Sequence, residues 1–166
     1  LTTFRAFAEE VTDKLLARLD KSRVASTRER VYPGAEGYPQ KEAEKRQWIA
    51  RVATASGLAN ERVEALLERY GTEAERLAQR REPEWRTPLK ALPDYTVGEI
   101  RMIAEGEQVV HLSDLVRRRS VITLLGRADE TALAELAEIA GDVLGWDAGR
   151  RQQEINIALA EAKGRK

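Results

Sequence analysis

The sequence has no cysteine and only one histidine, His111. Without cysteine the chain can form no disulfide framework, zinc ribbon or thiol nucleophile, and this composition fits a reducing compartment such as the cytoplasm. A single histidine excludes multi-histidine metal sites and makes a Ser-His-Asp triad a poor candidate. We therefore predict no metal site, and no residue stands out as catalytic.

The sequence also lacks a net charge and a long apolar run. Its 28 Lys and Arg residues are matched by 28 Asp and Glu residues. Nucleic-acid binders carry a basic surplus, so we expect no nucleic acid as a partner. No run of about 18 apolar residues is available to cross a bilayer, and no signal peptide is recognisable. We expect a cytoplasmic protein that touches a membrane at most peripherally.

What the sequence does contain is helical periodicity. With 166 residues, 42% of them hydrophobic, the chain can bury a sizeable core. The opening segment repeats apolar residues at steps of three and four, which predicts an amphipathic helix. Its stripe consists of Phe4, Phe7, Ala8, Val11, Leu15, Leu16 and Leu19. Similar stripes recur to the end, so we predict an all-α fold, an irregular bundle of about seven helices with two longer loops.

Local signals divide this chain into three predicted parts. Residues 1–20 form the opening helix, residues 21–40 form an irregular connection rich in Pro and Gly, and residues 41–166 form a helical domain. Within that domain Gly71 and Gly145 are predicted helix stops. Thr72 with Glu75 and Thr96 with Glu99 have the spacing of capping boxes. The run 121–125 has an apolar composition that suits a strand or a buried helix, and its type stays open.

Two features could bind an anion. Thr2 and Thr3 place hydroxyls and free N–H groups at a helix start, although without further context a plain helix cap is the favoured explanation. The run Arg117 to Arg119 is the densest cationic stretch. It would bind a phosphate or carboxylate, or form ion pairs with Asp114, Glu99 or Glu107. His111 is expected to serve a helix start or packing and not as a base.

Several motifs occur together in a family order. They are Leu1-Thr2-Thr3-Phe4-Arg5, Tyr70-Gly71, Glu99-Ile100, Glu107, Asp114-Leu115-x-x-Arg118-Arg119-Ser120 and Leu144-Gly145-Trp146-Asp147. In this order they resemble the C-terminal helical domain of FAD-dependent glycerol-3-phosphate dehydrogenase and glycerophosphate oxidase. The likeness covers essentially the whole chain. Val116 and Ser120 stand where that family usually has Leu and Thr.

The resemblance implies a longer parent flavoprotein that oxidises sn-glycerol 3-phosphate to dihydroxyacetone phosphate. Electrons would pass through FAD to a quinone or to oxygen. Because the chain begins with Leu1 and has no dinucleotide-binding glycine motif, we expect a domain fragment. This fragment is expected to bind no FAD and to be inactive by itself.

The resemblance also implies roles for single residues. Thr2 and Thr3 would lie near the flavin, residues 1–20 would close the flavin domain, and residues 41–166 would form a cap. Partners would be the parent's N-terminal flavin domain and a second copy in a homodimer. Asp114, Arg118 and Arg119, with Glu99 and Glu107, would form an ion cluster at an interface, or the same block would attract substrate phosphate. The alternative is a free-standing helical protein-interaction or polyanion-binding module.

Overall fold

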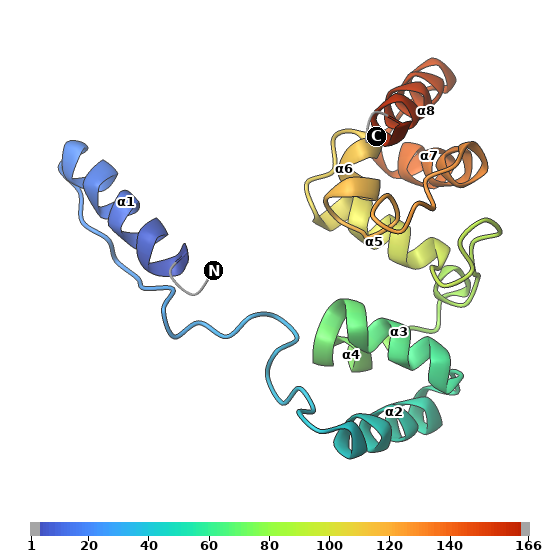
Figure 1. Ribbon diagram of the computed structural model, residues 1–166, viewed down its shortest axis with the longest axis horizontal. Coiled ribbons are helices and arrows are strands. Elements are labelled where there is room, and N and C mark those ends of the chain that lie inside the picture. Colours follow the sequence, from blue (N-terminus) through green and yellow to red (C-terminus); the bar gives the residue numbers. More distant parts are fainter. Residues whose placement is uncertain (1–3, 164–166) are drawn as a thin grey trace. The chain divides into compact units, whose positions relative to one another are not determined.

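The computed structural model describes residues 4–163, and every regular element in that range is a helix (Figure 1). The α-helices are α1 (Phe4–Arg18), α2 (Glu42–Ser56), α3 (Asn60–Tyr70), α4 (Ala74–Ala78), α5 (Val97–Gly106), α6 (Leu112–Arg117), α7 (Glu130–Leu144) and α8 (Ala148–Lys163). Two short 3-10 helices, η1 (Gly71–Glu73) and η2 (Pro83–Trp85), join some of them. The all-α prediction is confirmed, and the run 121–125 forms turns.

The chain divides into two compact units, residues 1–78 and residues 79–166. The first unit holds α1 to α4 and the second holds α5 to α8. Each unit has its own apolar core. The three-part division into 1–20, 21–40 and 41–166 stays a prediction.

In the first unit, α2, α3 and α4 pack around a small core. Its buried members are Ile49, Val52, Ala53, Val63, Leu66, Leu67, Ala74 and Ala78. They recur at steps of three and four, so each helix turns one apolar face inward. Gly57 ends α2 with a left-handed conformation, φ 70°, and its N–H donates to the carbonyl of Ala53.

The connection before α2 is fastened to the end of α3 by a close backbone contact. Gly71 has φ 58°, and a Cβ atom there would lie 2.1 Å from the carbonyl oxygen of Gly34. That same carbonyl accepts the N–H of Thr72 at 2.9 Å. The Thr72 hydroxyl donates to the carbonyls of Gly34 and Glu36. The predicted capping box of Thr72 and Glu75 is therefore wrong: Thr72 lies in η1 and serves this contact.

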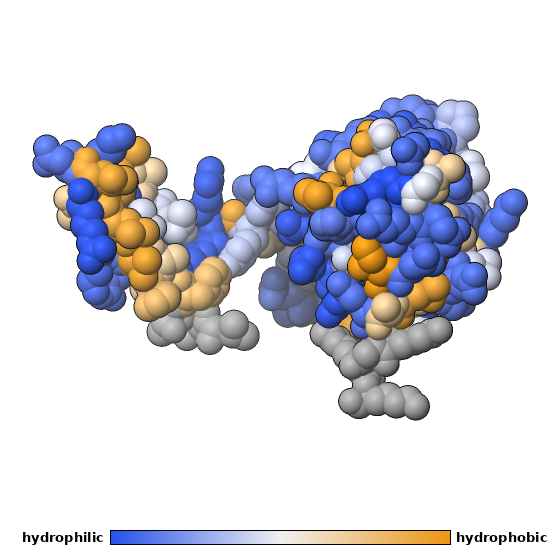
Figure 2. Space-filling view, turned by 90° about the horizontal axis from the view of Figure 1, so that it is seen from above, coloured by the Kyte–Doolittle hydropathy of each residue, from blue (hydrophilic) through white to orange (hydrophobic). Residues whose placement is uncertain are grey.

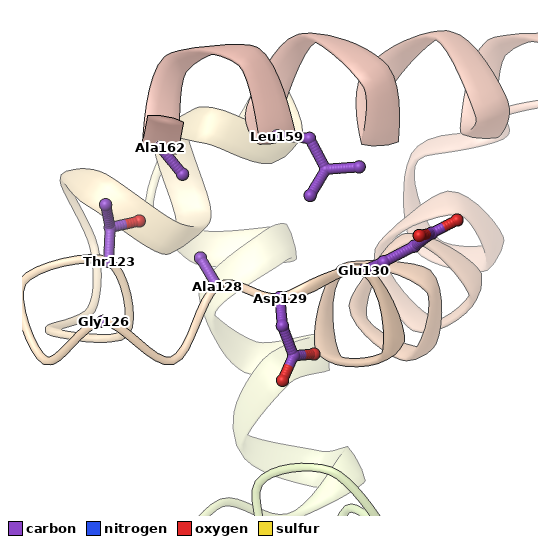
Figure 3. A pocket seen from close by; sticks show the side chains of 7 residues that line it. All are labelled: Thr123, Gly126, Ala128, Asp129, Glu130, Leu159 and Ala162. Carbon is purple, nitrogen blue, oxygen red and sulfur yellow. The ribbon is translucent and has the colours of Figure 1, made fainter. Parts of the chain in front are cut away.

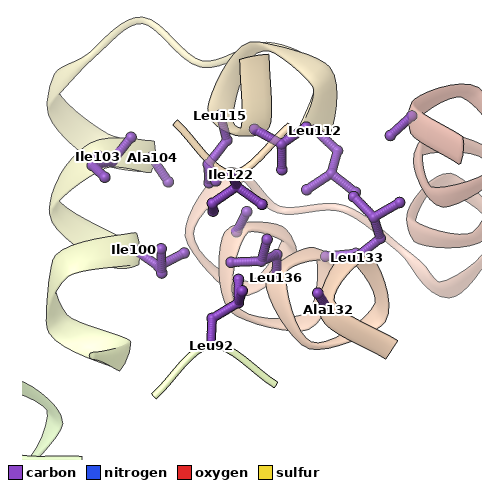
Figure 4. Close-up of a cluster of buried hydrophobic side chains, with 14 of the residues drawn as sticks. Leu92, Ile100, Ile103, Ala104, Leu112, Leu115, Ile122, Ala132, Leu133 and Leu136 are labelled. Carbon is purple, nitrogen blue, oxygen red and sulfur yellow. The ribbon is translucent and has the colours of Figure 1, made fainter. Parts of the chain in front are cut away.

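The second unit packs α5, α6, α7 and α8 around a larger core (Figure 4). Figure 4 shows side chains from α5, α6 and α7 converging, among them Ile100, Leu115 and Leu136. The predicted capping box at the start of α5 is confirmed, since Thr96 accepts the N–H of Glu99 and Glu99 accepts the N–H of Thr96. Gly145 ends α7 with φ 70°, as predicted.

We predict that Gly71→Ala destabilises the first unit by about 3 kcal/mol or more. With φ 58° and ψ −144°, Gly71 lies outside the left-handed helical region in a conformation that is essentially restricted to glycine and costs another residue about 1–3 kcal/mol, and displacement of the Gly34 carbonyl adds to that. Native-state hydrogen exchange at the amide of Leu67 measures the loss. The control is Gly57→Ala, which has φ 70° but nothing within 4 Å of its Cβ. Equal losses in the two variants would contradict the close-contact argument.

Candidate functional site

The first candidate site is the surface of α1. Thr2 and Thr3 lie outside the described residues, so their predicted role stays a prediction. The apolar stripe of α1 does form, but its large side chains are exposed (Figure 2). The exposed fractions range from 38% at Val11 to 66% at Phe7 and Leu19, with Phe4 and Leu15 between them. We call these five side chains the apolar stripe.

The opposite face of α1 binds the segment that follows the helix. This segment, residues 23–32, has no regular secondary structure and runs back along α1 (Figure 1); we call it the strap. Three side chains at four-residue spacing, Arg5, Glu9 and Asp13, bind it, and we call them the clamp. Residues four apart lie on the same helix face, which explains why one face contacts the whole strap.

Arg5 binds the backbone of the strap. Its Nη1 atom donates to the carbonyls of Thr27, Arg28 and Arg30 at 2.9, 3.1 and 2.6 Å. Its guanidinium also lies 4.2 Å from the ring centroid of Tyr32. A guanidinium is suited to this contact because it combines several N–H donors with a flat face that stacks on an aromatic ring.

Glu9 binds the donors of the strap. Its carboxylate, in a residue only 5% exposed, accepts hydrogen bonds and ion pairs from four residues of the strap. The donors are Ser26 Oγ at 2.6 Å, the Thr27 N–H at 2.8 Å, Arg23 Nη1 at 2.9 Å and Arg28 Nε at 3.0 Å. The Ser26 hydroxyl and the Thr27 N–H lower the pKa of Glu9 to about 2; burial opposes this, and Arg23 and Arg28 add to the lowering. Glu9 is thus a charged anchor.

A groove of about 290 Å³ lies between α1 and the strap. Its lining is mainly apolar and comes from both segments: Phe4, Arg5, Ala8, Thr27, Arg30, Val31, Tyr32 and Pro33. The groove adjoins the apolar stripe, because Phe4 belongs to both. Neither the clamp nor the groove was predicted from the sequence.

The second candidate site lies where α6 begins and α8 passes. Glu154 is fully buried, and its Oε2 accepts the N–H of Leu112 at 2.9 Å. Its Oε1 lies 2.9 Å from His111 Nδ1 and 2.6 Å from Arg150 Nη2. His111 is the residue that precedes α6, which agrees with the expected helix-start role. Sequence reasoning missed Glu154, although its four-residue spacing from Arg150 was a signal.

The predicted ion cluster forms only in part. Asp114 forms an ion pair with Arg118, and its Oδ2 accepts the backbone N–H groups of His111 and Val110. Burial opposes ionisation of Asp114, but these two N–H groups and Arg118 outweigh it and lower the pKa. The structure therefore brings Asp114 and Arg118 together.

The other predicted members of that cluster lie elsewhere. Glu99 is fully buried and accepts the N–H of Thr96. Glu107 follows α5 and is exposed. Arg119 is exposed, and its side chain has no hydrogen bond or ion pair with the described part of the chain. Arg117 forms an ion pair with Glu161 of α8.

A pocket of about 360 Å³ lies between residues 123–130 and α8 (Figure 3). It is lined by Thr123, Gly126, Ala128, Asp129, Glu130, Leu159 and Ala162. Figure 3 shows Leu159 and Ala162 of α8 facing the loop that carries Thr123. Asp129 accepts the N–H of Ala132 at 2.8 Å and so serves as the cap of α7. Capping is a sufficient role for this carboxylate.

Residues 4–163 are the part of the chain that the structure describes. No group of three or more His, Cys, Asp or Glu side chains there is arranged to hold a metal ion. In the same range, no helix combines the length and the apolar composition that a membrane crossing needs.

Comparison with known proteins gives consistent matches. Residues 25–151 match the family model for the C-terminal domain of alpha-glycerophosphate oxidase. A glycerol-3-phosphate dehydrogenase of Mycobacterium leprae is 31% identical over 158 residues, which are 93% of this chain and 26% of the relative. Glycerol-3-phosphate dehydrogenase 2 of Mycobacterium tuberculosis is 30% identical over 168 residues, which are 98% of this chain and 28% of the relative. No solved structure matches this chain.

We predict that the Glu9 carboxylate stays ionised well into the acid range. Its pKa, about 2, lies below the ordinary 4.5, so the clamp's contribution to stability is complete above pH 4.5 and is lost as the pH falls towards 2. An NMR titration of the Glu9 side-chain carboxyl carbon measures the midpoint. Ser26→Ala should raise it towards 4.5, and Ser22→Ala should leave it unchanged. A midpoint near 4.5 in the unaltered chain would contradict the clamp.

We also predict that Glu154→Gln destabilises the second unit by about 2–4 kcal/mol, because Arg150 and the Leu112 N–H lose a buried charged partner. Urea unfolding in a Trp48→Phe background measures this, since Trp85 and Trp146 then report on residues 79–166. The control is Glu161→Gln, which weakens a partly exposed pair and should cost less than about 1 kcal/mol. Losses of equal size would show that Glu154 has no special role.

Proposed function

Because this chain belongs to the family of the C-terminal domain of alpha-glycerophosphate oxidase, we propose that it is the C-terminal domain of a longer flavoprotein that oxidises sn-glycerol 3-phosphate to dihydroxyacetone phosphate. FAD would carry the electrons to a quinone or to oxygen. The chain spans about a quarter of the length of the curated relatives that it matches, 26% and 28%. The match over residues 25–151 is the observation that carries this proposal.

Apart from an isolated bridge between Pro88 and Thr96, residues 4–163 contain no strand pairing, whereas the dinucleotide fold needs a parallel sheet. FAD would therefore be held by the part of the longer protein that this chain does not cover. Thr2 and Thr3, which precede α1, would be this chain's contribution, because N–H groups at a helix start favour negative charge. By itself the chain would be an inactive structural cap.

The partner of α1 would be the preceding flavin domain. A soluble monomer seldom exposes a large contiguous apolar patch, so the exposed apolar stripe supports a surface that would be covered in the longer protein. The family match begins at residue 25, after α1 has ended at Arg18. This agrees with α1 belonging to the preceding domain. A homodimer contact, a cytoplasmic location and a peripheral membrane contact through the longer protein complete the proposal.

The arginine run would act at an interface. Arg117 and Arg118 already form ion pairs with Glu161 and Asp114, which disfavours a polyanion-binding module. Arg119 is exposed, so it would be the residue of the run that attracts the phosphate of the substrate. If Arg119 attracts the substrate phosphate, Arg119→Ala in the longer protein should raise the Michaelis constant for glycerol 3-phosphate. An unchanged constant would leave the run a purely structural role.

We predict that the longer protein ending in this chain contains FAD and oxidises glycerol 3-phosphate with an artificial dye as acceptor. The chain alone should show neither property. Assays with a quinone, and with oxygen as the sole acceptor, distinguish dehydrogenase from oxidase. A longer protein that binds FAD but leaves glycerol 3-phosphate unchanged would overturn the proposed activity.

We further predict that the double variant Phe7→Ser, Leu15→Ser lowers the FAD content and the thermal stability of the longer protein. Both side chains belong to the apolar stripe, and each buried side chain of this size contributes about 1.5–3 kcal/mol. The control is Val24→Ser, since Val24 is 99% exposed and lies outside the stripe. Equal losses of FAD content and thermal stability in the double variant and in Val24→Ser would show that the stripe faces solvent in the longer protein as well.

A further inference from the structure

We propose that α1 and the strap bind the preceding domain as one composite surface, in which the groove receives an apolar side chain of that domain. The clamp residues Arg5 and Glu9 would be positioning residues for this surface. The inference rests on the proposed function only in assuming that a preceding domain exists. Four observations support it.

The first observation is that the clamp supplies hydrogen bonds to the strap. The strap lacks the backbone hydrogen bonds of a helix or strand. Residues 23–32 are in neither helix nor strand. Unpaired backbone groups are costly wherever water is excluded. Arg5 binds three carbonyls of the strap, and Glu9 binds the N–H of Thr27. The strap is thus prepared for burial before any partner covers it.

The second observation is that the clamp leaves the apolar stripe uncovered. Successive residues are rotated by about 100° around a helix, so Val11 lies about 200° round the axis from Glu9. The two sets therefore occupy opposite faces of α1. The stripe stays exposed while the strap is bound, as the exposed fractions of Phe7 and Leu15, 66% and 56%, also show. Strap and partner can bind the helix at the same time.

The third observation is that the strap adds apolar surface to that of the helix. Val31 and Tyr32 are 60% and 54% exposed, and both line the groove. Arg5 orients the Tyr32 ring through the stacking contact at 4.2 Å. The groove volume of about 290 Å³ is roughly ten times the ~30 Å³ of a water molecule in the liquid. This is room for a large apolar side chain.

The fourth observation identifies the occupant. The Mycobacterium tuberculosis relative aligns with 98% of this chain, which leaves about three of the chain's 166 residues unmatched. The aligned part of the relative therefore includes the segments that correspond to α1 and the strap. The family match to the C-terminal domain nevertheless begins only at residue 25. Helix α1 thus lies outside that domain's range but within the relative. The chain spans 28% of that relative, so the occupant that we infer is the part of the longer protein that precedes this chain.

Site-resolved alkylation tests the groove, because the chain has no cysteine of its own. Val31→Cys is compared in the isolated chain and in the longer protein, with mass spectrometry following the introduced thiol. We expect alkylation to be at least tenfold slower in the longer protein. The control is Val24→Cys, at a strap position that is 99% exposed and should react equally fast in both. Equal rates for Val31→Cys in both proteins would overturn the inference.

Two further variants, made in the longer protein that carries Val31→Cys, test the fit and the clamp. Ala8→Trp fills the groove and should lower the thermal stability of the longer protein, whereas Ala17→Trp, on the same helix outside the groove, should not. Arg5→Met should restore fast alkylation of Val31→Cys, Arg5→Lys should restore it less because it retains a donor, and Arg18→Met should have no effect. If Ala8→Trp behaves like Ala17→Trp, or if Arg5→Met behaves like Arg18→Met, the composite surface is wrong.

The remaining outcomes separate this inference from the proposed function. Slow alkylation of Val31→Cys in a longer protein that does not oxidise glycerol 3-phosphate keeps the surface and rejects the activity. Fast alkylation in an active, FAD-containing protein rejects the surface alone. Protection that depends on protein concentration identifies a second copy as the occupant. Protection that requires anionic lipid vesicles identifies a membrane, and either result overturns the inference.

Discussion

The fold depends on glutamate carboxylates that accept backbone N–H groups outside regular helix bonding. Glu9 binds the strap, Glu99 the residue before α5, Glu135 the loop before α5 and Glu154 the start of α6. The N–H groups involved belong to Thr27, Thr96, Lys90, Ala91 and Leu112. A helical protein with long connections leaves many such donors unpaired, and a carboxylate can bind two of them at once. These glutamates let irregular segments pack against helices.

The same carboxylates also pair with part of the basic charge of the chain. Arginines form ion pairs with these carboxylates. Arg23 and Arg28 pair with Glu9, and Arg150 pairs with Glu154. Arg151 likewise joins α7 to α8 through Glu138 and Asp142, and it donates to the carbonyl of Trp146 at 3.1 Å. Much of the charge is thus used within the fold. Zero net charge here reflects pairing and not an absence of electrostatic structure.

Local signals predicted the elements well and the long-range contacts poorly. The helix stops at Gly71 and Gly145 and the capping box of Thr96 and Glu99 depend on neighbouring residues, and the structure confirms them. Glu9 could not be found in the same way, because the hydrogen-bond donors Ser26, Thr27 and Arg28 lie 17–19 residues away. Glu154 has Arg150 at four-residue spacing, but its contacts with His111 and Leu112 lie 43 and 42 residues away.

The wrong capping box and the open run have a physical cause as well. Thr72 and Glu75 have capping-box spacing, but the Gly34 carbonyl, 38 residues away, binds the hydroxyl instead. The run 121–125 is apolar enough for a core strand, yet Leu124 and Leu125 are exposed in a turn. Helical periodicity predicts that one face of a helix is apolar, but it does not identify the segment that packs against this face. In α5 and α7 the partner lies within the chain, whereas in α1 the stripe stays exposed and the strap binds the other face. An amphipathic helix whose polar face is occupied by its own chain has only its apolar face left for a partner, and this geometry is the basis for proposing that α1 contacts a preceding domain.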